Sequence, residues 1–223
     1  MRLKLISLAF MLMALGSLIL FSCEEEPDET KPVIKLNGST SIRWVLNRSF
    51  EEFEDPGYTA TDNVDGDLTE MVTVNTSNVN VDQTGVYEIE YYVLDNSENG
   101  DTVYRSIEVY NQAEVLNGYW DGDIDGATPK EYVDVIASSE TTNLEITFEK
   151  FGGYAENPIT GTVVYEGVEN APVVQIAEQS NTIDGEEHTF VVSNGYGLLR
   201  SNNKITLQYS DNGEMYLLTL IKQ

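Results

Sequence analysis

The sequence has little cysteine, little histidine and few basic residues. One cysteine and one histidine occur in 223 residues, and 12 lysines and arginines face 38 aspartates and glutamates, for a formal net charge of −26. A single cysteine leaves no partner for an internal disulfide. The acidic excess makes nucleic acids and anionic membrane surfaces poor partners, so we expect no nucleic-acid ligand.

Long apolar runs are also scarce, and the main one lies at the N-terminus. Met1–Lys4 is basic and an apolar run extends from Leu5 to Phe21, which is the plan of a secretory signal. The run is too short to span a bilayer comfortably, and an acidic stretch follows it. We therefore expect residues 1–22 to be removed as a signal peptide, which changes the net charge from −26 to −28 because Arg2 and Lys4 are lost.

Cys23 stands directly after this apolar run. The segment Leu20-Phe21-Ser22-Cys23 resembles the lipobox of bacterial lipoproteins, whose cysteine becomes the lipid-modified first residue, and a free or buried thiol is the alternative. The resemblance implies that Cys23 anchors the protein to the membrane through several acyl chains. The acidic residues after it resemble the export signal of Bacteroidetes lipoproteins, which implies an outer-membrane lipoprotein facing the cell exterior.

Residues 23–32 are acidic and contain Pro27 and Pro32, which predicts an extended tether. Short β-type runs separated by turn residues follow from residue 33 to residue 110 and predict a β-sandwich. In the longest run, period-two alternation places one set of side chains on the core face; these are Tyr87, Ile89, Tyr91 and Val93. The other runs are Val33–Leu36, Ile42–Val45, Met71–Val74 and Val103–Tyr110.

Several turn motifs in this region belong together. Asp55-Pro56-Gly57, the stretch from Ala60 to Thr69, Thr84-Gly85-Val86-Tyr87 and Asp95-Asn96 resemble the bacterial immunoglobulin-like domain first described as a repeat in a pesticidal crystal protein. The resemblance covers about residues 31–110 and implies an immunoglobulin-like sandwich at 33–110, in which Tyr87 occupies the position of a tyrosine corner. Ile89 stands where antibody domains place a disulfide cysteine, so this sandwich must rest on apolar packing.

Residues 115–223 are again rich in strand patterns and predict a second antiparallel β domain, either a small barrel or a sandwich. The strongest signal is a hairpin in which Lys204–Tyr209 and Glu214–Ile221 are joined through Asn212-Gly213. The opening Gly118-Tyr119-Trp120 resembles lipocalin-like domains. Further strands are expected at Leu144–Lys150, Gly161–Glu166, Val173–Ala177 and His188–Val192. The predicted fold class is therefore all-β, with two domains in tandem.

Two groups of aspartates are candidate calcium ligands. Asp121, Asp123 and Asp125 match the first half of an acidic calcium loop, but Tyr132 stands where the twelfth-position glutamate belongs. The alternative is an edge strand with the aspartates and Tyr119 outside and Trp120 and Ile124 inside. The second group, for which turn capping is the alternative, comprises Asp62, Asp65 and Asp67 of the immunoglobulin-like motif, with Asp95 as a further candidate. We expect no cofactor beyond weakly bound calcium.

Catalytic motifs are absent from the sequence. His188 is the only histidine and has no nucleophile motif near it, which predicts a solvent-facing strand residue. Gly195-Tyr196-Gly197 lacks the helix that a phosphate-binding loop requires and predicts a turn. A pair of carboxylates could hydrolyse glycosides, yet 38 acidic residues single out no pair. We therefore expect a protein that is not an enzyme.

Aromatic residues point to a ligand class, because 13 tyrosines and 2 tryptophans exceed what two small cores need. Aromatics beside polar groups are how β-sandwich modules hold sugars, although most will serve the core. The candidates for an exposed platform are Trp44, Trp120, Tyr154 and Tyr196. We expect an accessory lipoprotein that binds or presents polysaccharide, with the first domain as spacer and the second as binder. The alternative is a structural spacer, adhesin or protein-interaction subunit of an outer-membrane complex.

Overall fold

The computed structural model describes residues 26–125, 131–166, 171–193, 196–199 and 203–223, so Cys23 lies outside the described residues. Across these ranges the chain consists of β-strands, short 3-10 helices and loops, with no α-helix. This confirms the predicted all-β class. In the same ranges, no helix is long and apolar enough to cross a membrane.

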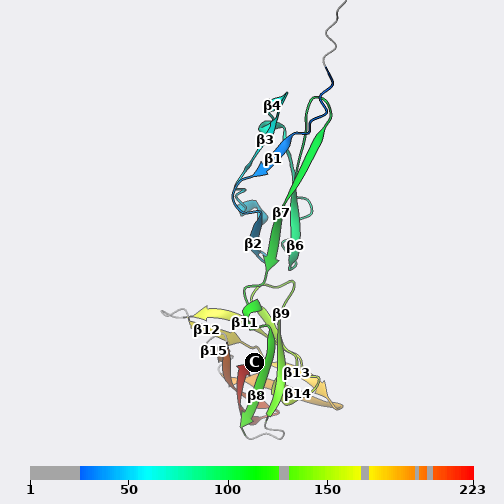
Figure 1. Ribbon diagram of the computed structural model, residues 1–223. Coiled ribbons are helices and arrows are strands. Elements are labelled where there is room, and N and C mark those ends of the chain that lie inside the picture. The colour runs from blue at the N-terminus through cyan, green and yellow to red at the C-terminus, as the bar shows by residue number, and fades with distance from the viewer. Residues whose placement is uncertain (1–25, 126–130, 167–170, 194–195, 200–202) are drawn as a thin grey trace, which may run out of the picture.

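The N-terminal unit contains two described sheets (Figure 1). One sheet has the order β1-β3-β4 and the other the order β2-β7-β6-β5, with β2 and β7 parallel and the other neighbours antiparallel. The strands are β1 (Val33–Leu36), β2 (Ser41–Val45), β3 (Tyr58–Asp62), β4 (Gly66–Asp67), β5 (Thr73–Asn75), β6 (Gly85–Leu94) and β7 (Gly100–Tyr110), with 3-10 helices η1 (Phe50–Glu52) and η2 (Thr69–Met71).

The core of this unit forms from the alternation that the sequence predicts. Ile89, Tyr91 and Val93 on β6 are buried, and Tyr87 packs against the same cluster. The Tyr87 hydroxyl donates a hydrogen bond of 3.0 Å to the Gln83 carbonyl, which is the bond of a tyrosine corner. Sequence reasoning missed strand β3, because its run Tyr-Thr-Ala-Thr-Asp carries few apolar residues.

A fully buried arginine joins the two sheets. Arg105 on β7 is 0% exposed, and its Nε donates to the Tyr91 hydroxyl at 3.1 Å. Its Nη2 donates to the carbonyls of Asn37 and Gly57 at 3.1 Å each. The Tyr91 hydroxyl in turn donates to Asp55 at 2.6 Å, and burial raises the pKa of Tyr91 to about 12. The charged group is therefore supplied with acceptors from several segments.

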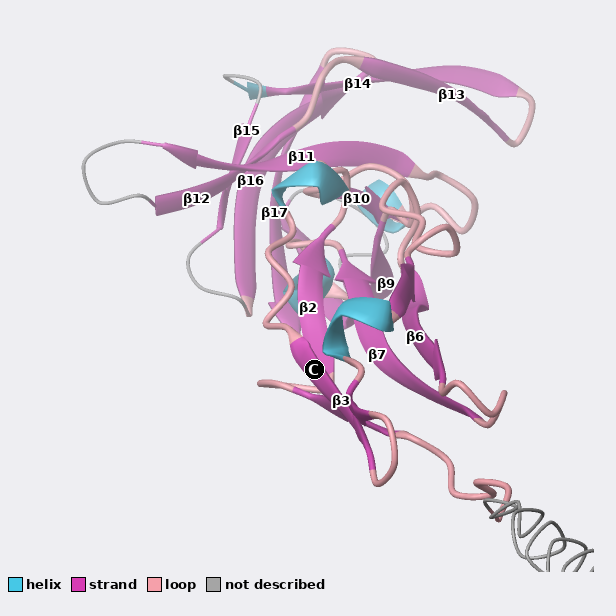
Figure 2. Cartoon of the chain, turned by 90° about the horizontal axis from the view of Figure 1, so that it is seen from above, coloured by secondary structure: helices cyan, strands magenta, loops and turns pink. Residues whose placement is uncertain are grey.

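The C-terminal unit is a sheet that closes on itself (Figure 2). Among the described strands, eight pair in a ring because β16 binds both β15 and β17, and the β13–β14 hairpin is added to β16 outside it. The strands are β8 (Gly118–Asp125), β9 (Glu131–Ser138), β10 (Glu145–Phe148), β11 (Ile159–Glu166), β12 (Ala171–Gln175), β13 (Gln179–Ile183), β14 (Glu186–Val192), β15 (Tyr196–Leu199), β16 (Lys204–Asp211) and β17 (Glu214–Lys222).

Apolar side chains fill the interior of this ring. Trp120, Phe148 and Phe151 are each 0% exposed and belong to one cluster. Phe151 comes from the 3-10 helix η4 (Phe151–Gly153) and makes edge contacts with Phe148, Phe190 and Tyr209. The predicted hairpin is present, and Asn212 and Gly213 both have positive φ, at 48° and 89°, as a type I′ turn requires.

Candidate functional site

The outer face of strands β5, β6 and β7 carries two rows of aligned polar and aromatic side chains. The strand register places Tyr92 between Thr73 and Thr102. It places Glu90 between Asn75 and Tyr104 in the next row. Because alternate residues of a strand share a face, these six side chains point away from the buried Tyr91. We call these six residues the β5–β7 face.

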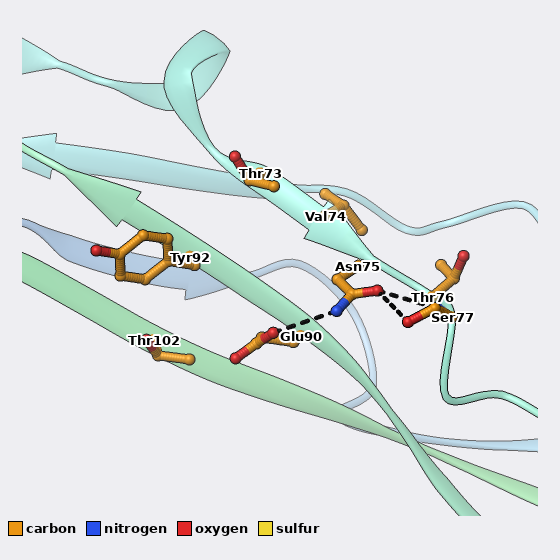
Figure 3. Close-up of a pocket in the computed structure, with 8 residues that line it drawn as sticks. All are labelled: Thr73, Val74, Asn75, Thr76, Ser77, Glu90, Tyr92 and Thr102. Carbon is orange, nitrogen blue, oxygen red and sulfur yellow. Dashed lines mark hydrogen bonds between the residues drawn. The ribbon is translucent and has the colours of Figure 1, made fainter.

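A hollow of about 700 Å³ opens on the β5–β7 face (Figure 3). Val74, Thr76 and Ser77 complete its lining on the β5 side. Tyr92 and Tyr104 are 39% and 49% exposed, so their rings offer apolar surface to a ligand. The hydroxyls of Thr73, Thr102 and Ser77 surround the hollow with groups that can donate and accept hydrogen bonds.

Local hydrogen bonds hold the polar side chains of this hollow in place. The Asn75 Oδ1 accepts from the backbone N–H and the hydroxyl of Ser77 at 3.0 and 2.7 Å. Its Nδ2 lies 3.5 Å from Glu90 Oε2, and the Tyr104 hydroxyl lies 3.4 Å from Glu90 Oε1. The Asn75 amide is therefore positioned before a ligand arrives, which lowers the entropy cost of binding.

A second hollow, of about 490 Å³, lies on strands β8, β9 and β17. Asp121, Asp123 and Glu131 give it a more acidic lining than the β5–β7 face, together with Val133 and Ile221. Tyr119 beside it is 62% exposed. Gly122 is required here, because a Cβ at this position would approach the Tyr132 ring to 2.3 Å.

The structure corrects the expected aromatic platform. Trp120 is 0% exposed and donates through Nε1 to the Leu116 carbonyl at 2.9 Å. Trp44 is 7% exposed, and the rings of Phe50 and Phe53 pack edge-on against it. Both tryptophans are core residues, since their large apolar surface is needed to fill two small cores.

The two tyrosine candidates also differ from expectation. Tyr154 packs against the core and donates to Asp211 Oδ2 at 2.7 Å. Burial raises the pKa of its hydroxyl well above the usual range. Tyr196 begins strand β15 and is not part of a turn; its side chain lies outside the described residues.

His188 lies in a hydrogen-bonded cluster, and the expectation of a solvent-facing histidine was wrong. Its Nδ1 lies 2.9 Å from both carboxylate oxygens of Asp211, and its ring stacks on Phe190. The same carboxylate accepts from Tyr154. His188 therefore fixes the β14–β16 pairing around Asp211.

Asp121, Asp123 and Asp125 are strand residues, so the calcium-loop interpretation is corrected. Register pairs Asp121 with Val133 and Asp123 with Glu131 across β8 and β9. Alternation along β8 turns the three carboxylates outward and buries Trp120 and Ile124, as the alternative interpretation predicted. That interpretation was wrong about an edge strand, because β8 pairs with both β9 and β17. Residues 126–130, which would complete a loop, lie outside the described residues.

The second aspartate group is held mainly by turn capping. Asp62 Oδ1 accepts from the backbone N–H groups of Val64 and Asp65, and these bonds lower the pKa of Asp62. Asp67 accepts from Thr69 N at 2.9 Å. Asp62 and Asp65 have carboxylate oxygens within 4.8 Å of Asp28 from the tether; Asp67 is not in this cluster.

One carboxylate is buried without full hydrogen bonding. Asp134 on β9 is 0% exposed, and its Oδ1 accepts from the backbone N–H groups of Val135 and Lys150 at 2.8 Å each. Its Oδ2 has no hydrogen-bond partner among the described residues. Burial raises the pKa of Asp134 to about 6.

Sequence reasoning missed the β5–β7 face, although the signal for it is the same alternation that located the core. If Ile89, Tyr91 and Val93 face inward, then Glu90 and Tyr92 must face outward. The neighbours of these residues could not be assigned, because the register of β5 and β7 against β6 is set by the connecting loops, and a shift of one residue would move every side chain to the other face. Asn75 lies 15 residues before Glu90 in the chain.

Comparison with known proteins identifies the class of the N-terminal unit. Residues 34–109 match the family described as "Bacterial surface protein, Ig-like domain", which confirms the immunoglobulin-like resemblance found in the sequence. An 89-residue stretch is 40% identical to the pesticidal crystal protein Cry22Aa of Bacillus thuringiensis. That alignment covers 39% of this chain and 12% of the relative, so the chain spans a small part of that protein.

Two solved structures are similar over most of the chain but at low score. The lipoprotein BT2262 from Bacteroides thetaiotaomicron aligns at 19% identity and a TM-score of 0.35, over 86% of this chain and 100% of that one. The CBM51-2 and INT domains of Clostridium perfringens ZmpB, in complex with GlcNAc, align at 16% identity and a TM-score of 0.28, over 86% and 43%.

Proposed function

We propose that this protein is a non-catalytic, lipid-anchored surface protein of the bacterial outer membrane that binds neutral glycans on the β5–β7 face. The observation that carries the proposal is the hollow that exposed Tyr92 lines one row along the strands from the Asn75 amide and the Glu90 carboxylate (Figure 3). A sugar ring can stack its C–H face on a tyrosine while its hydroxyls pair with amide and carboxylate groups.

The negative charge of the chain favours neutral glycans over anionic ones. A net charge of −26 and the Glu90 carboxylate in the hollow repel sulfated or uronic polysaccharides. The uncharged hydroxyls that line the same hollow match the hydroxyls of neutral sugars. The proposed ligand is therefore a neutral oligosaccharide or polysaccharide. We propose the immunoglobulin-like domain as the binder in place of the C-terminal unit, because Trp120 and Tyr154 of the C-terminal unit belong to or pack against its core.

Lipid anchoring through Cys23 is the second part of the proposal. It rests on the lipobox-like segment and on the absence of any other cysteine from the sequence. Cys23→Ala should move the protein from the membrane fraction to the soluble fraction. Unchanged fractionation of the variant would show that Cys23 is not the anchor.

A glycan array probed with the full chain tests the ligand, followed by affinity measurement on a glycan that binds. Tyr92→Ala should weaken binding about tenfold, because loss of ring stacking costs on the order of 1.4 kcal/mol. Tyr119→Ala is the matched control, since Tyr119 is a tyrosine of the C-terminal domain that is 62% exposed. If Tyr92→Ala leaves the affinity unchanged, the β5–β7 face is not the site.

The second candidate function is protein interaction, and the face of β8, β9 and β17 favours it. Tyr119, Leu217 and Ile221 are exposed on this face beside the carboxylates of Asp121 and Asp123. The register places Asp121 between Val133 and Ile221, so carboxylates and exposed apolar side chains alternate on this face. Exposed apolar side chains gathered on one face favour a protein partner. An array with no bound glycan, together with loss of a co-purifying membrane protein in Tyr119→Ala, would favour this function.

A further inference from the structure

The junction between the two units is held by side chains rather than by a free linker. Strand β7 ends at Tyr110, the 3-10 helix η3 (Glu114–Leu116) follows, and β8 begins at Gly118. The loop between β9 and β10, residues 139–144, contacts the end of the immunoglobulin-like domain next to this junction. We call this segment the 139–144 loop.

Asn111 is the centre of these contacts and is 1% exposed. Its Nδ2 donates to the carbonyls of Ser139 and Thr142 at 2.8 and 2.9 Å. Its Oδ1 accepts from the N–H groups of Ala113 and Leu144, both at 2.8 Å. An amide side chain has two donor hydrogens and two acceptor lone pairs, so the hydrogen-bonding capacity of Asn111 is fully used.

Asn47 makes an attachment from the immunoglobulin-like domain itself, whereas Asn111 lies in the segment that joins the two domains. Its Nδ2 donates to the Thr141 carbonyl at 3.1 Å, and its Oδ1 accepts from Asn143 N at 3.0 Å. Its own backbone has a φ of 64°, a conformation that asparagine tolerates better than most residues. This geometry turns the side chain toward the loop.

Thr84 and Gln112 add two more attachments. Thr84 N donates to the Glu140 carbonyl at 2.8 Å. Gln112 N donates to Asn143 Oδ1, and Asn143 Nδ2 donates to Gln112 Oε1, both at 2.9 Å. The 139–144 loop is thus bound from three separate segments, at residues 47, 84 and 111–112.

We infer that the 139–144 loop locks the two domains into one rigid rod. Domains joined by a short linker move relative to each other by default, and one point of contact would leave a hinge. Attachments from three segments of the chain restrain rotation more than one contact does. Breaking the joint would also separate the buried Asn111 amide from its hydrogen-bond partners. Losing buried hydrogen bonds costs more free energy than losing exposed ones.

The rigid joint gives the molecule a fixed reach. The tether and the C-terminal unit lie at opposite ends of the immunoglobulin-like domain (Figure 1). A rod of this kind holds the C-terminal domain at a set distance and angle from the anchored end, whereas a hinged chain would let it fold back. The inference is independent of the proposed glycan binding, because it uses none of the residues of the β5–β7 face.

Residual dipolar couplings of the isotope-labelled full chain test the inference. One alignment tensor should fit the amides of both domains in the wild type. Asn47→Gly keeps the positive φ but removes both side-chain hydrogen bonds to the 139–144 loop. The two domains should then need separate alignment tensors, one of smaller magnitude than the other. Asn111→Ala should have a larger effect of the same kind. Asn80→Ala is the control, because the Asn80 side chain caps only its own turn at Asp82.

The rod is refuted if the wild type needs two tensors of different magnitude. It is also refuted if Asn47→Gly and Asn111→Ala both keep a single tensor, because the joint would then be rigid for another reason. Should Asn111→Ala fail to fold, Asn47→Gly decides alone, since it alters only the contact with the loop and leaves its backbone geometry available.

Discussion

The two domains are both antiparallel β structures, but they solve the problem of holding sheets together differently. In the immunoglobulin-like domain, two open sheets are tied by the buried Arg105, which binds Tyr91 and backbone carbonyls of the facing segments. In the C-terminal domain, pairing of β16 with β17 closes the sheet and apolar residues fill it. Among the described strands, the closed ring has no free edge of its own, whereas the added hairpin ends at one, strand β13.

The two domains differ in how they accommodate buried polar groups. With no cysteine pair available, the open sandwich uses a charged network that is fully hydrogen-bonded, and Arg105 has acceptors for its donors. The closed sheet needs no such tie, and its buried carboxylate Asp134 has one oxygen without a partner. We therefore expect opposite responses when each buried charge is removed.

The largest expected effect is at Arg105. Arg105→Ala should lower the free energy of unfolding of the immunoglobulin-like domain by about 4 kcal/mol, because removing one member of a buried polar network leaves the others unsatisfied. The C-terminal domain should keep its own transition. In calorimetry of the full chain, one unfolding transition should move to a lower temperature and the other should stay unchanged. An equal fall in both unfolding temperatures would contradict this expectation.

Asp134 should respond in the other direction. Its folded pKa of about 6 lies above the ordinary 3.8, so the group stabilises the folded state at low pH and this stability is lost as the pH rises through about 6. The loss amounts to about 3 kcal/mol. Asp134→Asn should therefore raise the free energy of unfolding at pH 7 by about 2 kcal/mol and flatten its dependence on pH.

Denaturant unfolding at pH 5 and pH 7 measures this effect. Asp82→Asn is the matched control, because Asp82 is an exposed aspartate and its replacement changes the net charge equally. A lower stability of Asp134→Asn at pH 7 would show that the buried carboxylate contributes more through its bonds to Val135 and Lys150 than its burial costs.

A smaller effect is expected at the tyrosine corner. Tyr87→Phe removes the hydrogen bond to the Gln83 carbonyl and keeps the ring, which should cost about 1 kcal/mol. The loss should fall on the immunoglobulin-like domain alone. A chemical denaturation curve of the variant checks this, and a loss below about 0.3 kcal/mol would mean that water replaces the bond.

The fold was predictable from local patterns, and its details were predictable only where those patterns were strong. Alternation along Tyr87–Val93 and the Asn212-Gly213 turn located a core face and a hairpin because both signals lie within one short segment. Closure of the C-terminal sheet could not be predicted, because pairing of β8 with β17 joins residues about a hundred positions apart. The sequence left barrel and sandwich open for this reason.

The candidate site was harder to predict than the fold. Trp44 and Trp120 were chosen by residue type, yet large aromatic rings are also what small cores bury. The β5–β7 face consists of common residue types such as Asn75 and Thr102. These residues form a candidate site only because strand pairing aligns them across three strands. Residue type alone carries no information about that alignment.

Amide chemical shifts show directly whether the β5–β7 face binds glycan. The full chain, isotope-labelled, is titrated with the tightest-binding glycan from the array. Saturable shifts are expected at Thr73, Asn75, Tyr92 and Thr102, which line the hollow, and no shifts are expected along β8 and β17. Saturable shifts confined to Tyr119–Asp125 and Leu217–Ile221 would contradict binding at the β5–β7 face and place the site on the C-terminal domain.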